Sequence, residues 1–234
     1  MDIIHKLEGA ISNCKNGEFC VNCLGPHAWD EGWALYAGSS EGVDGDGDGF
    51  MMYALANKRC ENFATCTRDD DGSDTTGTSA VNAEVLDLFH EGQGYILSGK
   101  YNDADDVKDK IIDLMSVSLM QGLLRCRATH PAPPGTSTKL TPNGCDKEED
   151  ELWAFAASIL PRIHECDAYV ASTIRANTEL GETDAPVDDG YVALREQLES
   201  VYSCMGISCS QVGGLVIEGS MEYYEGFSPC EDGD

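Results

Sequence analysis

The sequence predicts an all-α protein, a disulfide-stapled helical bundle of about six to seven helices with long acidic and Pro-rich loops. Apolar residues recur at helical spacing along most of the 234-residue chain, whereas the alternating pattern of β-strands is nearly absent. Hydrophobic residues make up 41% of the chain, which is enough to fill a core. Eleven cysteines fall in local groups, which indicates disulfides formed in an oxidising compartment.

The first predicted helix spans residues 26–36. It begins at Pro26 and carries acidic residues early, as helix N-termini favour. Trp29, Trp33 and Tyr36 follow at helical spacing. We therefore expect these three aromatic side chains to share one face of the helix.

The middle of the chain alternates between loops and helices. Residues 44–49 alternate Asp and Gly and predict a loop, whereas 50–63 regain an apolar helical pattern. The segment 67–78 is acidic and rich in Gly, Ser and Thr, so we expect a surface loop. Ser79 is then expected to cap a helix that ends near Ser98.

The second half of the chain predicts longer helices. We expect them at 103–127, 146–179 and 191–205, with a glycine-weakened last helix at 208–224. Pro161 is expected to kink the helix that contains it, because proline lacks an N–H group. Four prolines between residues 129 and 144 predict an extended loop.

We expect residues 1–234 to form a single domain. It includes a cysteine-rich N-terminal segment at 1–26 and a C-terminal tail at 210–234, which we expect to be a truncated one. The Pro-rich loop is the only candidate internal boundary, and we do not expect it to divide domains. The first five residues lack the basic and apolar regions of a signal peptide, so we expect a secreted precursor whose leader has been removed.

The cysteines are expected to close short loops within local groups. These groups are Cys14 with Cys20 and Cys23, Cys60 with Cys66, Cys126 with Cys145, and Cys204 with Cys209. Cys20 and Cys23 also have the spacing of a zinc knuckle, but no second C-x-x-C follows, so disulfides are favoured. The odd count leaves one thiol over, and Cys230 is the candidate, with a partner expected beyond residue 234.

The formal net charge of −27 excludes several kinds of partner. Nucleic acids and anionic membrane surfaces would be repelled, so we expect no nucleic-acid partner, and metal cations are the natural ligands. Keeping the protein soluble is an equally good explanation of the charge. No apolar stretch approaches the roughly 20 residues of a membrane span, so we expect no direct membrane insertion.

Enzyme signatures are absent from the sequence. It contains no G-x-S-x-G, no H-E-x-x-H, no P-loop and no dinucleotide-binding glycine pattern. Cysteines in disulfides make poor nucleophiles. With so many acidic residues, some pair of carboxylates could always lie close enough for hydrolysis, so their number alone is no evidence for a hydrolytic site. We therefore expect the protein not to be an enzyme.

Three helical segments place carboxylates and imidazoles at i, i+3 or i+4, on one helix face. They are His27 with Asp30 and Glu31, Asp87 with His90 and Glu91, and His164 with Asp167. A solvated polar face is favoured for the second set. The first and third sets have bulky neighbours, so we expect their acids to be at least partly buried, bound to a cation or to an interhelix partner. Mixed carboxylate and imidazole ligands suit Fe or Mn.

The loop at 44–49 matches the first half of an EF-hand. Asp44, Asp46 and Asp48 stand at alternate positions, with Gly49 at the sixth. The twelfth position, where a bidentate Glu is needed, is Leu55. We therefore favour a flexible acidic turn over a weak Ca²⁺ site.

Four segments resemble the algal iron-assimilation proteins. They are AWDEGWALYAGS at 28–39, YALANKRCENFATC at 53–66, LMQGLLR at 119–125 and FAASILPRIHECDA at 155–168. The resemblance implies a periplasmic or cell-surface protein of an alga, induced by iron shortage or high CO₂ and involved in gathering iron. The Asp-rich insertion at 44–48 departs from the family pattern, which adds weight to the alternative of an additional divalent-cation contact there.

The first hypothesis is a non-catalytic extracellular protein that binds Fe²⁺ or Fe³⁺ and hands it to a membrane iron transporter or reductase. Its predicted ligands are Asp30, Glu31, His164 and Asp167, with His27 and Glu61 as outer candidates. The second hypothesis is a structural or interaction module of the cell surface, in which these residues form an interhelix network. The third is a metal-dependent enzyme of inorganic carbon metabolism, which requires three histidines, His27, His90 and His164, to converge on zinc.

Overall fold

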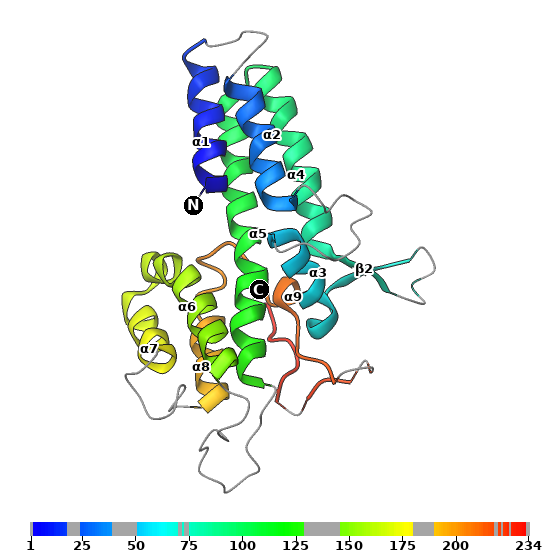
Figure 1. Cartoon of the computed structure of the whole chain (residues 1–234), viewed down its shortest axis with the longest axis vertical. Helices are drawn as coiled ribbons and strands as arrows, with labels where there is room; N and C mark the ends of the chain where they lie inside the picture. Colours follow the sequence, from blue (N-terminus) through cyan, green and yellow to red (C-terminus); the bar gives the residue numbers. More distant parts are fainter. Residues whose placement is uncertain are drawn as a thin grey trace, which may run out of the picture. The chain divides into compact units, whose positions relative to one another are not determined.

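The structure, a computed structural model, describes residues 2–17, 24–38, 51–69, 72, 75–128, 146–179, 190–217, 220, 222–224 and 226–232. These residues form nine helices, one two-stranded antiparallel sheet and three disulfides (Figure 1). The predicted helical, disulfide-linked fold is confirmed. The chain divides into two compact units, 1–61 with 66–115 and 62–65 with 116–234, so the boundary falls within a helix and not at the Pro-rich segment. A single domain stays a prediction.

Long helices run side by side in the first unit (Figure 1). Its elements are α1 (Asp2–Lys15), α2 (Leu24–Ala37), most of α3 (Met52–Phe63), β1 (Cys66–Arg68), β2 (Thr75–Ser79), α4 (Ala80–Leu97) and the part of α5 (Tyr101–Ala128) that ends at Met115. No helix is predicted at 2–15, yet α1 occupies it. Ile3, Leu7, Ala10, Ile11 and Cys14 are its buried residues, a helical stripe with polar positions between them.

The segment between α3 and α4 is a β-ribbon, so the prediction of a loop at 67–78 is wrong where β1 and β2 pair. Cys66 lies opposite Ser79, and Arg68 lies opposite Thr75, in antiparallel register. Threonine is β-branched and favours extended backbone, which explains why this polar segment pairs. The predicted disulfide between Cys60 and Cys66 is confirmed and joins α3 to the ribbon.

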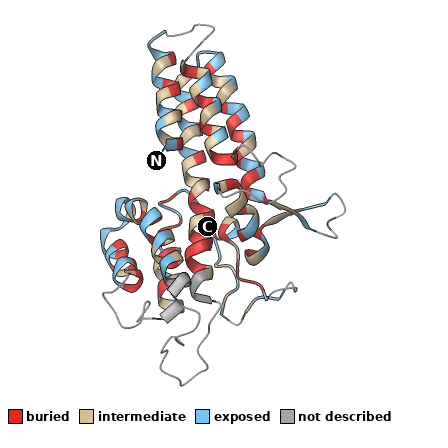
Figure 2. Ribbon diagram, viewed as in Figure 1, coloured by how far each residue is buried: buried red, intermediate tan, exposed pale blue. Residues whose placement is uncertain are grey.

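Helix α4 begins after Ser79, as predicted, and packs one face inward (Figure 2). The Ser79 side chain makes no capping hydrogen bond; its backbone N–H donates to Asn57 Oδ1 at 2.9 Å. Gly92 lies on the buried face, where an added Cβ would come within 2.1 Å of Trp29 Cζ2. Glycine at this position thus lets the indole of α2 lie directly against the backbone of α4.

The second unit contains the rest of α5, followed by α6 (Asp146–Cys166), α7 (Ala168–Thr178), α8 (Gly190–Glu199) and α9 (Cys209–Val212). The single helix predicted over 146–179 is wrong, because two helices meet at Asp167. Pro161 lies inside α6, which continues for five residues beyond it. The buried face of α6 includes Leu152, Ala156, Ile159 and Ile163, which recur at helical spacing.

Disulfides in the second unit join distant segments. Cys166 pairs with Cys204, and Cys209 pairs with Cys230, so a local Cys204–Cys209 bridge and an outside partner for Cys230 are both wrong. Spacing alone does not encode these pairs, since the fold brings together cysteines 38 and 21 residues apart. Of the other predicted groups, Cys14 is buried, whereas Cys20, Cys23 and Cys145 and the side chain of Cys126 lie outside the described residues.

The helix predicted at 208–224 is wrong beyond one turn. Helix α9 ends at Val212, and its C-cap is Gly213, whose φ of 74° suits glycine and few other residues. The chain then becomes extended, and Val216 forms an antiparallel bridge with Tyr223. Asp232 accepts hydrogen bonds from the backbone N–H groups of Cys209, at 2.6 Å, and Ser210, at 3.3 Å, so the C-terminal segment is tied to the start of α9.

Replacing Gly92 with alanine is expected to destabilise the protein by about 1–3 kcal/mol, because the new methyl group overlaps the indole of Trp29. Urea unfolding measures the change. Gly94→Ala in the same helix is the matched control, since nothing lies within 4 Å of its Cβ position. The control should gain up to about 1 kcal/mol from helix propensity. Equal effects of the two substitutions would contradict the close approach at Gly92.

Candidate functional site

Helix α2 carries three of the predicted ligands on its outer side. Trp29 and Tyr36 are each 1% exposed and fix the inner side of the helix. Asp30, the next residue after Trp29, is exposed, and the side chains of His27 and Glu31 are 71% and 39% exposed. The expectation of partial burial is therefore wrong for Asp30, because the bulky neighbours turn inward and the acid turns outward.

The inner side of α2 belongs to an aromatic cluster that holds the helix in place. The Trp29 indole N–H donates to the Phe89 carbonyl of α4 at 2.9 Å, and the two rings meet edge to face. Trp33 contacts the rings of Tyr36, Tyr53 and Phe89, so the predicted aromatic face exists. Such edge contacts add to the area that the rings bury.

Glu31 is held by two basic neighbours. The Lys6 ammonium of α1 donates to Oε2 at 2.5 Å, and His27 Nε2, one turn earlier in α2, lies 3.3 Å from Oε1. The hydrogen bond from Lys6 is the main reason why the pKa of Glu31 lies below its ordinary value of 4.5; the small desolvation of the carboxyl opposes this, and the charges of Lys6 and His27 reinforce it. The Glu31 carboxylate is thus already paired with the ammonium group of Lys6.

Asp30 and Glu61 have different surroundings. Asp30 Oδ1 accepts a hydrogen bond from Gln93 Nε2 of α4 at 2.7 Å, near the surface. Glu61 lies on α3 and is exposed. Asp30 therefore links α2 to α4 through a hydrogen bond, as an interhelix network requires.

His164 and Asp167 belong to the second unit and are both exposed, so partial burial is wrong for them as well. Asp167 is the N-cap of α7: its Oδ1 accepts from the backbone N–H groups of Tyr169, at 2.8 Å, and Val170, at 3.1 Å. His164 lies in the last turn of α6. The capping bonds give Asp167 a structural role that its sequence context conceals.

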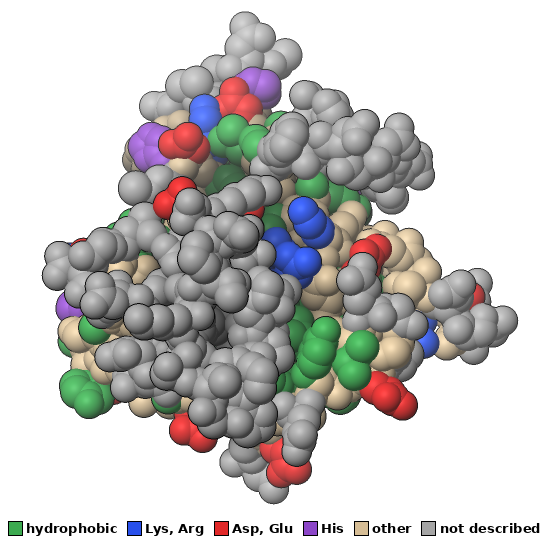
Figure 3. Space-filling view, turned by 60° about the horizontal axis from the view of Figure 1, so that its bottom comes forward, with side chains coloured by type: hydrophobic (Ala, Val, Ile, Leu, Met, Phe, Trp, Pro, Cys, Tyr) green, Lys and Arg blue, Asp and Glu red, His purple; other side chains and the backbone are tan. Residues whose placement is uncertain are grey.

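The structure brings His27 and Glu31 together and places His164 and Asp167 in the other unit. Within the described part of the chain, no three His, Cys, Asp or Glu side chains are grouped closely enough to hold a metal ion. In Figure 3, acidic side chains are visible at several separate places among the residues drawn in colour. Asp44, Asp46 and Asp48 lie outside the described residues.

Two partners of the predicted ligands, Lys6 and Gln93, escape the sequence analysis. The apolar spacing of α1 is the signal that would have placed Lys6 on a helix. A buried polar network is also missed: Tyr36 donates to Asn82 Oδ1 at 2.6 Å, and Asn82 Nδ2 donates to Asn57 Oδ1 at 2.7 Å. Burial and the neighbouring Tyr53 raise the pKa of Tyr36, so its phenol stays protonated and can donate.

The fold and the disulfides define an acidic helical protein of an oxidising compartment. The chain belongs to the family of low iron-inducible periplasmic proteins, Fea1, whose profile matches residues 2–224. The predicted family and the periplasmic or extracellular location are thereby confirmed. No curated protein and no solved structure matches the chain significantly. In the described segments, no helix has both the length and the apolar character of a membrane span.

Asp167→Ala is expected to lower the free energy of unfolding by about 1 kcal/mol, because two N–H groups of α7 lose their acceptor. Asp167→Asn retains an N-cap oxygen and should recover most of the loss. Urea unfolding, measured once with a metal chelator and once with added iron, gives the change for both variants. A loss that appears only when metal is present would contradict the capping role.

Glu31→Gln is expected to change the acid side of the stability profile. Because Lys6 lowers the folded pKa of Glu31, the carboxylate stabilises the fold above about pH 4.5, and this contribution disappears as the pH falls through the lowered pKa. Melting temperatures of the wild type and the variant should therefore differ near neutral pH and converge in acid. Glu8→Gln on α1, at an exposed residue, is the control. Its melting temperature should differ little from that of the wild type at every pH. A difference in melting temperature between the wild type and Glu31→Gln that grows in acid would contradict the ion pair.

Proposed function

We propose that this protein is a non-catalytic iron-binding protein that concentrates iron at the cell surface for uptake. The observation that carries the proposal is membership of a family named for its induction by low iron and its periplasmic location. Iron is then the cargo, passed on to a membrane transporter or reductase. The chain has 42 acidic and 15 basic residues, and the resulting negative field attracts cations to the protein and repels anions.

The outer side of α2 is the strongest candidate for the first contact with iron. His27 and Glu31 are one helical turn apart with their side chains already in contact, an arrangement in which both can bind the same ion. Asp30 is a neighbouring carboxylate, and these ligand types suit iron. Asp167, His164 and Glu61 stay proposed ligands, but they lie outside α2 and would have to bind iron elsewhere, apart from the α2 pair.

A structural or interaction role is the second candidate, and specific contacts favour it. Glu31 pairs with Lys6 of α1, and Asp30 accepts a hydrogen bond from Gln93 of α4. Both contacts join neighbouring helices, as expected of polar residues that organise a bundle. The two candidates differ in one respect: an iron site is stabilised by added iron, whereas an interhelix network is indifferent to it.

Iron titration of the full chain distinguishes the two candidates. The double variant His27→Gln, Glu31→Gln should bind Fe²⁺ or Fe³⁺ at least about tenfold more weakly than the wild type, because it loses both donors of the α2 pair. Lys6→Ala should bind up to about fivefold more tightly, since Glu31 loses a competing cation. Calorimetry and the iron-induced shift in melting temperature measure both effects.

The matched control is His90→Gln, Glu91→Gln on α4, which removes the same residue types and the same charge. It should bind iron as the wild type does. Wild-type affinity in the α2 variant would reject this site. If iron also fails to raise the melting temperature of the wild type, while Glu31→Gln lowers it with or without iron, the structural candidate is correct.

A further inference from the structure

The outer side of α2 presents its three candidate ligands in a fixed angular order. His27 precedes Asp30 by three residues and Glu31 by four, so both carboxylates are helical neighbours of the imidazole. Successive residues of an α-helix are turned by about 100°, so the two carboxylates diverge from each other by that angle. His27 therefore lies between Asp30 and Glu31 on the surface of the helix.

The helices that pack against α2 each hold one of the two carboxylates. Helix α2 lies against α1 and against α4 within the first unit (Figure 1). The Lys6 ammonium of α1 donates to Glu31 Oε2 at 2.5 Å, and the Gln93 amide of α4 donates to Asp30 Oδ1 at 2.7 Å. The two acids are thus directed toward different helices.

Core packing fixes the contact between Asp30 and Gln93. Trp29, the residue before Asp30, donates its indole N–H to the carbonyl of Phe89, which lies one helical turn before Gln93. Gly92 lets the indole lie directly against the backbone of α4, so the spacing of the two helices is set at this point. Gln93 consequently meets Asp30 at a position that the core determines.

This arrangement explains why only two donors meet on α2. His27 Nε2 lies 3.3 Å from Glu31 Oε1, whereas no three His, Cys, Asp or Glu side chains form a metal-binding group in the described part of the chain. Asp30 is exposed, so a change of rotamer alone can turn its carboxylate from Gln93 toward His27. One hydrogen bond from an uncharged amide therefore separates a two-donor surface from a three-donor one.

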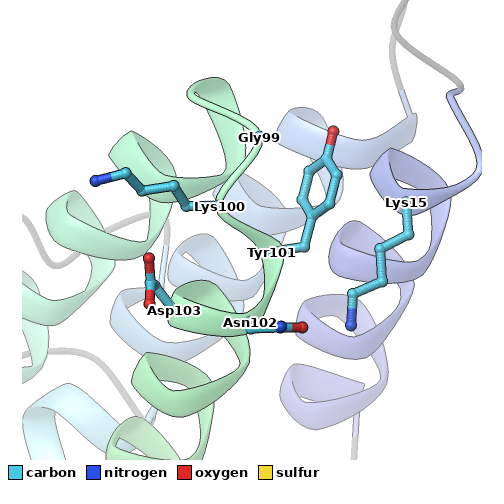
Figure 4. A pocket seen from close by; sticks show the side chains of 6 residues that line it. All are labelled: Lys15, Gly99, Lys100, Tyr101, Asn102 and Asp103. Atoms are coloured by element: carbon cyan, nitrogen blue, oxygen red, sulfur yellow. The ribbon is translucent and has the colours of Figure 1, made fainter.

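The surface at the turn between α4 and α5 offers no comparable arrangement. Lys15 and residues 99–103 line an open pocket there, and none of them belongs to α2. In Figure 4 the side chains of Lys15, Lys100 and Tyr101 point in different directions. The outer side of α2 is therefore the better candidate for binding an ion in the first unit.

We propose that Gln93 controls the α2 site by withholding Asp30 as its third donor. This proposal rests on the iron-binding role proposed above. An ion that reaches His27 and Glu31 attracts the Asp30 carboxylate away from Gln93, so that one imidazole and two carboxylates bind the ion, a ligand set that suits iron. When the ion leaves, Gln93 and Lys6 recover their carboxylates, which favours release. Gln93 is thus a positioning residue, because it acts through Asp30.

The test is titration of the full chain with Fe³⁺ by calorimetry and, in parallel, with Tb³⁺, a hard trivalent cation whose emission nearby tryptophans sensitise. Gln93→Leu should bind both ions about threefold more tightly, since Asp30 no longer has to leave a hydrogen bond. Asp30→Asn should bind both at least about threefold more weakly, because a charged donor is lost. The double variant should bind as Asp30→Asn does, since the effect of Gln93 passes through Asp30.

Emission lifetimes of bound Tb³⁺ in H₂O and D₂O count the water molecules on the ion. Asp30→Asn should carry about one or two more waters than the wild type, because a carboxylate binds through one or two oxygens. A purely structural role of Gln93 and Asp30 would leave this number unchanged.

Tyr95→Phe is the matched control for Gln93→Leu, because it removes a hydrogen bond of 2.8 Å to the Glu91 carboxylate on the same helix. Asp87→Asn, at another exposed aspartate of the first unit, is the control for Asp30→Asn. Both controls should bind as the wild type does. The proposal is overturned if Gln93→Leu leaves the affinity unchanged, or if it changes the affinity equally with and without Asp30→Asn.

Asp30→Asn keeps the test decisive if Gln93→Leu folds poorly, because the change is at an exposed residue. Unchanged affinity and water count in Asp30→Asn would overturn the proposal alone. Iron binding by the wild type with none of these effects rejects the role of Gln93 and leaves the iron-binding role standing. The expected terbium results without iron binding reject the iron-binding role and leave the control by Gln93. Binding of neither ion overturns both.

Discussion

The packing of Trp29 against Gly92 is the contact on which the first unit depends most. It brings α2 and α4 close enough for the indole N–H to reach the Phe89 carbonyl, which would otherwise be masked by a side chain at position 92. Once Trp29 is fixed inward, helical geometry turns Asp30 and Glu31 outward. The orientation of the candidate ligands is therefore a consequence of core packing, and it places them where α1 and α4 can supply Lys6 and Gln93.

The second unit contains disulfides and buried polar contacts that join its segments. Two disulfides join the end of α6 to the segment after α8 and the start of α9 to the C-terminal segment. The buried Gln121 of α5 donates to Thr65 Oγ1 at 3.0 Å and to the Val212 carbonyl at 2.9 Å. Buried amides of this kind fix one arrangement of neighbouring segments, because a shifted arrangement would leave them unsatisfied.

The sequence predicted best those elements whose residues have a single physical role, such as burial in the core or formation of a local disulfide. Helices α4 and α5 have long apolar stripes, which record burial directly. The cysteines of α3 and β1 lie close in the chain, so their pairing follows from proximity. Helix α1 carries an apolar stripe at helical spacing that indicates a helix, although the cysteines drew attention to the segment 1–26 instead. The threonines of β2 are polar residues with a preference for extended backbone, so they gave no clear signal.

The candidate site was less predictable, because a carboxylate serves equally well as a metal ligand, a helix cap or an ion-pair partner. Asp167 caps α7, and Glu31 binds Lys6, but neither role differs in sequence from metal binding. Bulky neighbours predicted burial for Asp30, although along a helix adjacent residues point in different directions. The distant disulfides depend on tertiary proximity, which spacing does not reveal.

The exposure of the α2 side chains has a kinetic consequence. A metal ion held by His27 and Glu31 would be in contact with solvent, because the two side chains are 71% and 39% exposed. Exchange of the ion would then involve dissociation of these two ligands and the return of Lys6 to Glu31. Such a surface suits rapid transfer of an ion between partners, whereas long-term storage would call for ligands that enclose it.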